Sequence, residues 1–124
     1  MRSFFISDNS SVEDTTDGDL SIVAMGGELD YEASPQLRAR LVGAIKAGGR
    51  RLVLDLSDVT FIDSTAIGVL AGTVARLDEA GGGSLAVVST NDKVLQIFEI
   101  TGLDGVISLH SSREEAVSAF SLAG

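Results

Sequence analysis

Hydroxyl and carboxylate side chains gather at three places in an otherwise apolar chain. They lie in the runs 27–30 (Gly-Glu-Leu-Asp), 58–64 (Asp-Val-Thr-Phe-Ile-Asp-Ser) and 89–92 (Ser-Thr-Asn-Asp). Each run follows an apolar segment typical of a strand, and functional groups of parallel sheets collect at the carboxyl ends of the strands. We therefore expect the three runs to meet at one edge of a sheet.

Ser64 has the most informative position, because a helix is expected to begin there. The free backbone N–H groups and the positive end of the helix dipole favour an anion at such a place. A phosphate on the hydroxyl would add about −1.5 to −2 charges and three acceptor oxygens. The alternative is that Ser64 simply caps the helix, as serine commonly does, and Thr65 could do the same. Spacing alone leaves both interpretations open.

The first half of this helix is apolar nearly all round. Seven residues cover more than the ~100° stripe by which a surface helix packs, namely Ala66, Ile67, Val69, Leu70, Ala71, Val74 and Ala75. Such a helix is either wholly buried or shows an apolar patch to a partner. Gly68 and Gly72, four residues apart, either pack closely on the sheet or let another protein come close.

Short apolar segments bounded by glycine and polar residues predict the strands. They span residues 20–25, 51–56, 85–88 and 106–107, and a first strand is expected at either 3–7 or 11–15. Helices are expected from Ser34, from Ser64 to Ala80, over about 94–101, and from Ser111 or Ser112. In the first of them Ser34 is expected as the N-cap, with proline at the first helical position.

Strands that alternate with helices predict an α/β domain with a largely parallel sheet. We expect a mixed, mostly parallel sheet of four to five strands packed with about four helices. At 124 residues the chain has the length of one domain. We place this domain at residues 11–124, after a flexible lead-in at residues 1–10.

Charge and composition exclude several classes of function. Nine Lys and Arg against eighteen Asp and Glu give a net charge of −9, which argues against a nucleic-acid partner and favours a basic protein partner. There is no cysteine, which excludes disulfides and thiolate chemistry. No apolar run approaches the ~20 residues of a membrane span. The apolar stretch at the start of the sequence is too short for a signal peptide. We expect a cytoplasmic protein that binds neither nucleic acid nor membrane.

Enzyme chemistry finds little support in the residues. A response-regulator receiver would use an aspartate at a strand end, such as Asp55, but the acidic pair and the lysine it also needs are not in place, and Lys93 is misplaced for that role. There is no Gly-x-Ser-x-Gly elbow, and His110, the single histidine, is expected in a loop before the last helix. The acids are scattered without the spacing of metal ligands. The sequence therefore predicts no catalytic residue, no metal site and no cofactor.

Residues 27–106 resemble the STAS family of anti-sigma factor antagonists. The motifs that carry the resemblance are GELD at 27–30, LVLDLSDVTFIDSTAIGVL at 52–70, AGGGSLAVV at 80–88 and FEITGL at 98–103. They span essentially the whole domain, and DSTAIGVL in this setting is the most specific of them. One departure is Ala66, where many members have glycine. Alanine favours a helix by roughly 0.5–1 kcal/mol over glycine, so the helix start is expected to be stiffer.

The resemblance implies a STAS-type fold and a partner-switching mechanism. In such proteins the unphosphorylated antagonist binds an anti-sigma factor that is also a serine kinase, and this frees the sigma factor for transcription. The kinase, with ATP and magnesium, phosphorylates the serine after the aspartate, here Ser64, and a metal-dependent serine phosphatase reverses the step. The expected partner-binding residues are Asp30, Asp63, Ser64, Thr65, Ala66, Ile67, Gly68, Ser89 and Thr90.

A STAS domain with another task is the main alternative. It would act as a scaffold or as a small-ligand sensor in a bacterial signalling complex. The adjacent hydroxyls of Ser64 and Thr65 favour the phosphorylation switch without excluding those roles. The sequence also leaves weak self-association open.

Overall fold

A computed structural model describes residues 13–123 of the chain, with side chains for residues 17–120. These residues form five strands, four α-helices and one short 3₁₀ helix. In chain order they are β1 (Glu13–Asp17), β2 (Leu20–Leu29), α1 (Ser34–Lys46), β3 (Arg51–Ile62), α2 (Ser64–Glu79), β4 (Ser84–Val88), α3 (Asp92–Thr101), η1 (Leu103–Gly105), β5 (Ser108–His110) and α4 (Arg113–Ala123).

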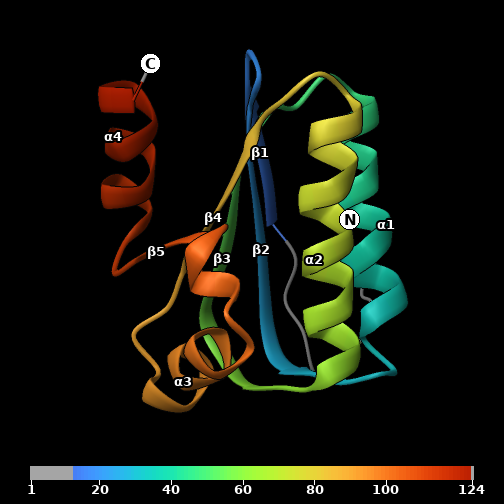
Figure 1. Cartoon of the computed structure of the whole chain (residues 1–124), viewed down its shortest axis with the longest axis vertical. Coiled ribbons are helices and arrows are strands. Elements are labelled where there is room, and N and C mark those ends of the chain that lie inside the picture. Colours follow the sequence, from blue (N-terminus) through green and yellow to red (C-terminus); the bar gives the residue numbers. More distant parts are fainter. Residues whose placement is uncertain (1–12, 124) are drawn as a thin grey trace.

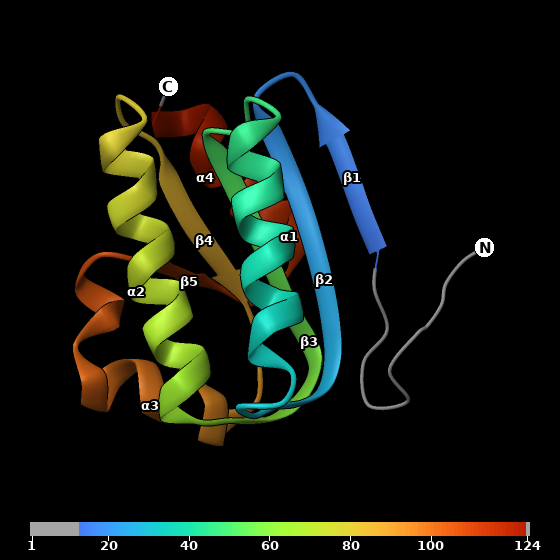
Figure 2. The ribbon, with the colours of Figure 1, turned by 90° about the vertical axis from the view of Figure 1, so that its right-hand side faces the viewer.

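The strands form one sheet in the order β1-β2-β3-β4-β5. β1 is antiparallel to β2, and all the other neighbours are parallel. Figure 1 shows the sheet nearly on edge, with α1 and α2 on one face and α4 on the other. Figure 2 shows α1 and α2 side by side in front of the sheet, with β1 at its outer edge. The predicted mixed, mostly parallel sheet with four helices is confirmed.

Two apolar cores lie on the two faces of the sheet. The larger contains buried side chains of α1, α2 and α3, among them Leu41, Leu70 and Phe98, together with residues on one face of β2 and β3. The smaller lies under α4 and contains Val53, Val88 and Ala116. A strand covered on both faces needs apolar side chains in both directions, and this explains why the segment 52–56 has only one polar residue, Asp55.

β3 is twice as long as the sequence predicted, since it runs to Ile62 and not only to residue 56. Period-2 alternation holds only at its start, where Leu52, Leu54 and Leu56 enter the larger core; the next two residues to do so are Val59 and Ile62. The pairing with β2 shows the cause. Between Ala24 and Gly26, and again between Gly27 and Glu28, β3 has one residue more than β2. Such bulges break the alternation, and this made residues 58–64 resemble a loop.

Three further expectations are wrong in detail. β2 continues to Leu29, so that the 27–30 run is mostly strand and not loop. The N-cap of α1 is Ala33, and the Ser34 hydroxyl instead donates to the carbonyl oxygen of Asp30 at 2.9 Å. The last strand is Ser108–His110, and not 106–107, because the N–H groups of Val106 and Ile107 both donate to the carbonyl oxygen of Leu103 in the turn that follows η1. His110 therefore belongs to a strand.

The ends of the helices follow local sequence signals. Gly102 ends α3 with a φ of 77°, which is the left-handed conformation that favours glycine at this position. The N–H group of Glu115 donates to the Ser112 hydroxyl at 3.1 Å, as the capping-box spacing predicted. Its carboxylate accepts from the N–H group of Ser111, one residue earlier than in the usual box. The first strand, β1, overlaps the expected 11–15 segment, whereas residues 3–7 lie outside the described part of the chain.

Candidate functional site

Asp63, and not Ser64, caps α2. Its backbone is extended (φ −108°, ψ −179°), and its Oδ1 accepts a hydrogen bond from the N–H group of Ala66 at 3.1 Å. Ser64 is the first helical residue, and both Ser64 and Thr65 are exposed. No hydrogen bond of the Ser64 hydroxyl is found within the part of the chain that the structure describes. The interpretation of Ser64 as a cap is therefore wrong, and its hydroxyl is available for other chemistry.

Asp30 lies beside this helix start. The N–H group of Asp63 donates to the carbonyl oxygen of Leu29 at 3.1 Å. Because Asp30 directly follows Leu29, this hydrogen bond holds Asp30 close to Asp63. Its Oδ1 accepts from the N–H groups of Glu32 and Ala33, both at 3.1 Å, which closes a turn of the kind that aspartate favours. The structure thus brings Asp30 and Asp63 to one corner of the sheet, next to the Ser64 hydroxyl.

The helix that follows Ser64 is not wholly buried, and its exposed face consists largely of small residues. Ala66, Ile67 and Leu70 point into the core, whereas Gly68 and Gly72 are exposed. A Cβ atom added at either glycine would meet nothing within 4 Å. Close packing on the sheet therefore does not explain the two glycines. The interpretation that remains is a flat strip of small residues, open to an approaching surface.

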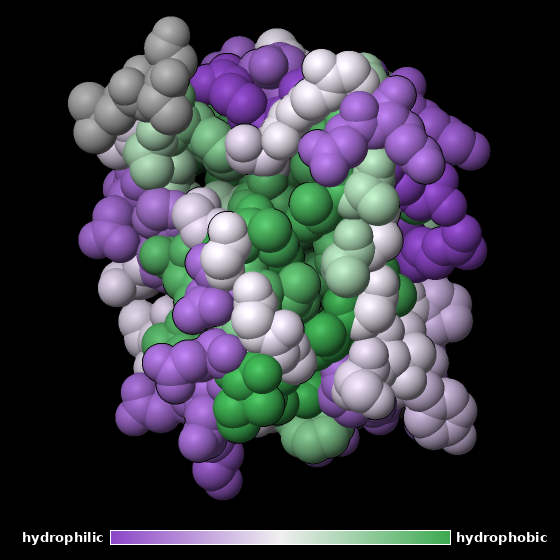
Figure 3. Space-filling view, in the orientation of Figure 1, coloured by the Kyte–Doolittle hydropathy of each residue, from purple (hydrophilic) through white to green (hydrophobic). Residues whose placement is uncertain are grey.

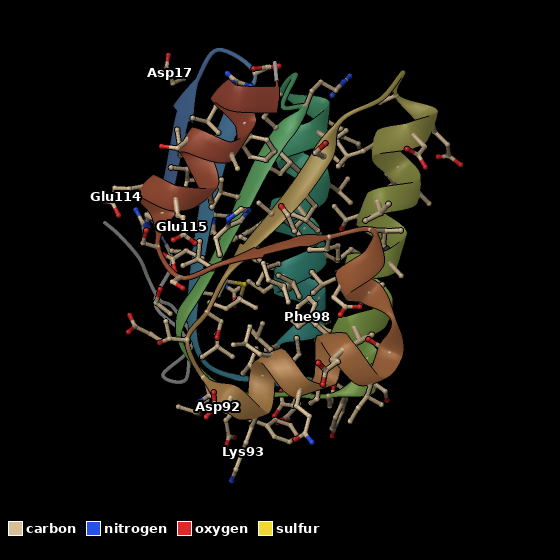
Figure 4. All side chains as sticks on the ribbon, turned by 60° about the vertical axis from the view of Figure 1, so that its left-hand side comes forward. Asp17, Asp92, Lys93, Phe98, Glu114 and Glu115 are labelled. Carbon is tan, nitrogen blue, oxygen red and sulfur yellow. The ribbon has the colours of Figure 1, made fainter. Side chains whose placement is uncertain are left out.

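The remaining expected residues differ in exposure. Ser89 is buried, and its Oγ accepts from the N–H group of Asn91 at 3.1 Å, whereas Thr90 is exposed. Asn91 caps α3 through the N–H groups of Lys93 and Val94, and Figure 4 shows Asp92 and Lys93 pointing away from the body of the protein. Three of the expected partner-binding residues, Ala66, Ile67 and Ser89, can act only by shaping the backbone, since their side chains are covered.

Two exposed aromatic residues at the same edge were not predicted. Tyr31 is 68% exposed and Phe61 47% exposed; Tyr31 follows Asp30 directly, and Phe61 precedes Asp63 by two residues. Phe61 faces solvent because of the second bulge of β3. An aromatic residue beside a charged one in an expected loop was the available signal, and such residues are enriched in the energetic centres of interfaces.

The site is acidic. The segments 20–37 and 52–75 contain six Asp and Glu residues and no Lys or Arg. One of the six, Asp55, is buried and bound to Arg113 across 58 residues of sequence. Burial alone would raise the pKa of Asp55, but hydrogen bonds from Ser57 and Arg113 outweigh it and lower that pKa below its usual value. The other five acids lie on β2 or β3 or within three residues of their ends: Glu28, Asp30, Glu32, Asp58 and Asp63.

Apolar surface is also found away from this corner. Figure 3 shows apolar side chains gathered along the middle of the face seen in Figure 1, with polar side chains around them. Ile100 is 73% exposed at the end of α3, and Val106 is 61% exposed before β5.

Within residues 13–123 no group of three or more His, Cys, Asp or Glu could hold a metal ion, and no helix there is long and apolar enough to cross a membrane.

Comparison with known families decides the classification. The family model described as "STAS domain" matches residues 11–116. The chain belongs to the STAS family. The resemblance seen in the sequence is thus confirmed.

Two of the relatives are bacterial anti-sigma-B factor antagonists. The anti-sigma-B factor antagonist of Staphylococcus aureus is 31% identical over 106 residues, covering 86% of this chain and 97% of the relative. That of Bacillus subtilis is 35% identical over 95 residues, covering 77% and 85%. An anti-sigma factor antagonist from Mycobacterium paratuberculosis has a similar structure, with a TM-score of 0.80 and 26% identity over 94% of this chain and 97% of the other.

Proposed function

We propose that this STAS protein is an anti-sigma factor antagonist controlled by phosphorylation of Ser64. Its unphosphorylated form binds an anti-sigma factor that is also a serine kinase, and this binding releases the sigma factor. Transfer of a phosphate from ATP to Ser64 ends the binding, and a metal-dependent serine phosphatase restores it. The protein itself acts by binding in the cytoplasm, not by catalysis, and has no direct contact with nucleic acid.

The observation that carries this proposal is the unused hydroxyl of Ser64. Asp63 already supplies the N-cap of α2, so a hydroxyl at position 64 is not needed to begin the helix. It is exposed at the first turn, where the helix dipole favours an anion. The named relatives are anti-sigma-B factor antagonists, and this supports an anti-sigma factor as the partner of the site.

The geometry also supports a reason why phosphate would end the binding. A phosphate at the first turn is compatible with the fold, since no side chain covers Ser64. It would stand beside the carboxylate of Asp63 at an edge that is already acidic. A partner that covers this edge must remove water from both anions, which is costly unless it supplies paired charges. We therefore expect the phosphate to act at the interface and to leave the sheet unchanged.

Phosphorylation with a candidate kinase tests the proposal directly. The chain is incubated with a candidate anti-sigma factor kinase, ATP and magnesium, and the modified residue is mapped by mass spectrometry. We expect one phosphate on Ser64 in the unmodified chain and none in the Ser64→Ala variant. Failure of the chain both to bind this kinase and to take up phosphate at Ser64 would favour a scaffold role instead.

The glycine strip of α2 gives a second test with a built-in control. Gly68 and Gly43 are both exposed helical glycines whose added Cβ atom would meet nothing within 4 Å. Leucine at either position should raise the free energy of unfolding by about 0.5–1 kcal/mol, because glycine is a poor helix former. Only Gly68→Leu should weaken binding to the anti-sigma factor, measured by calorimetry, since Gly43 lies on α1. Equal affinities of the two variants would remove the glycine strip from the interface.

A further inference from the structure

Asp55 is a buried carboxylate that the proposed switch does not use. It lies on β3, pointing to the α4 side of the sheet, and is 8% exposed. Both of its oxygens are occupied. Oδ1 accepts from the N–H group of Ser57 at 2.9 Å and from the Ser57 hydroxyl at 2.5 Å, whereas Oδ2 accepts from Nε of Arg113 at 2.5 Å.

The Oδ1 contacts hold the first bulge of β3. Asp55 pairs with Ala24 and Asp58 with Gly26, so that Leu56 and Ser57 together stand opposite Met25. A bulged residue loses its place in the ladder of backbone hydrogen bonds. The carboxylate of Asp55 replaces the lost partner of the Ser57 N–H group.

The first bulge fixes the register of everything that follows on β3. Without the extra residue, the segment after Ser57 would shift by one position along β2, and a shift of one residue turns each side chain to the opposite face. Ile62 would then leave the larger core, and the hydrogen bond from the N–H group of Asp63 to Leu29 would be lost. The position of Asp63, and of Ser64 after it, therefore depends on this bulge.

The Oδ2 contact fixes α4. Arg113 is the first residue of that helix, and its side chain is 33% exposed. Figure 4 shows this first turn, marked by Glu114 and Glu115, beside the sheet. The remainder of α4 is held mainly by Ala116, Val117 and Phe120, which pack in the smaller core. One carboxylate thus joins α4 to the bulge.

We infer that Asp55 and Arg113 are positioning residues for the Ser64 corner, coupling the docking of α4 on one face of the sheet to the backbone that places Ser64 on the other. The role of that corner rests on the proposed function, but the coupling itself does not. Loosening α4 should loosen residues 57–64, and anything that binds or displaces α4 should alter how Ser64 is presented. The lowered pKa of Asp55 agrees with a carboxylate held in its charged form by these contacts.

Amide hydrogen exchange on the full chain, followed by NMR, tests the coupling without any partner or kinase. Arg113→Met removes the α4 contact but leaves both Ser57 contacts with Asp55. We expect exchange to become roughly ten-fold faster both in α4 and at residues 57–64, the size expected for one lost charged hydrogen bond. Asp55→Ala should accelerate the same two segments further. Amides in the middle of α1 should change less in both variants.

The matched control is Arg51→Met. Arg51 donates from Nε to Oδ1 of Asp19 at 2.7 Å, which is the same pair of groups. Asp19, however, is exposed where Asp55 is buried, and the pair lies at the other end of β3. This variant should leave exchange at residues 57–64 unchanged. If Arg113→Met accelerates only α4, the two segments are independent and the inference is wrong. If it accelerates α1, α2 and the sheet equally, it lowers only the overall stability, and the inference is also wrong.

A failure of the coupling can be distinguished from a failure of the proposed function. Exchange at residues 57–64 can be coupled to α4 whether or not Ser64 accepts a phosphate. Conversely, phosphate uptake at Ser64 that is the same in the unchanged chain and in Arg113→Met, together with unchanged exchange at residues 57–64, would support the antagonist function while contradicting the coupling.

Discussion

Ser64→Ala should bind the anti-sigma factor permanently, whatever the kinase activity present. The variant cannot accept a phosphate, and its side chain is exposed at the first turn of α2, where the cap is supplied by Asp63. Its free energy of unfolding should therefore stay within about 0.5 kcal/mol of the unchanged chain. After incubation with kinase and ATP, the unchanged chain should lose its affinity, whereas Ser64→Ala should keep it.

Ser64→Asp should do the opposite. Its carboxylate imitates part of the phosphate charge, and at a helix N-terminus it should stabilise the fold slightly, by about 0.3–1 kcal/mol. Binding should nevertheless weaken by roughly ten-fold to a hundred-fold, because an anion next to Asp63 loses its water in the interface. Titration calorimetry of both variants against the anti-sigma factor measures the difference.

The control for this pair is Thr65→Asp, which adds the same charge one residue later on the same exposed turn. It should weaken binding less than Ser64→Asp does. NMR spectra of the phosphorylated chain should change around Ser64 only; changes throughout the sheet would contradict an effect confined to the interface. Equal affinities of Ser64→Ala and Ser64→Asp would remove Ser64 from the mechanism.

Asp55→Asn should lower the free energy of unfolding at pH 7. It should also make that free energy fall less steeply as the pH is lowered. The substitution removes the charge that faces Arg113 across the edge of the smaller core, and losing one partner of a nearly buried pair should cost about 2–3 kcal/mol. Because the pKa of Asp55 is lowered in the folded protein, its charged form stabilises the fold. That stabilisation is fully present above the unfolded pKa of about 3.9 and is lost as the pH falls below this value through the folded pKa.

Urea unfolding at pH 7, 5, 4 and 3 measures both effects. The difference between the unchanged chain and Asp55→Asn should be constant from pH 7 to 5 and should shrink towards pH 3. Asp58→Asn serves as the control, since Asp58 is an exposed acid on the same strand, and it should change the free energy of unfolding by no more than about 0.5 kcal/mol. A difference that stays the same at pH 3 would show that the charge of Asp55 does not stabilise the fold.

Some features of this protein are determined by local sequence, that is, by residues only a few positions apart in the chain. The order of strands and helices follows from the spacing of apolar residues and glycines. The end of α3 follows from Gly102, because that position needs a left-handed backbone, and the start of α4 follows from Ser112 and Glu115. Each of these signals acts through hydrogen bonds or backbone angles that span less than two helical turns.

The tertiary structure decided the features that depend on distant partners. The two extra residues of β3 have meaning only against β2, so a pattern of single-strand alternation missed half of that strand. Whether Gly68 and Gly72 pack or stay open depends on what lies above α2, and there the structure has open space. The sequence predicted no partner for Asp55, whereas the structure places Arg113, 58 residues away, on its carboxylate. The start of α2 near Ser64 follows from local sequence. The sheet register that places Ser64 at its corner does not, because register is set between two strands and not within one.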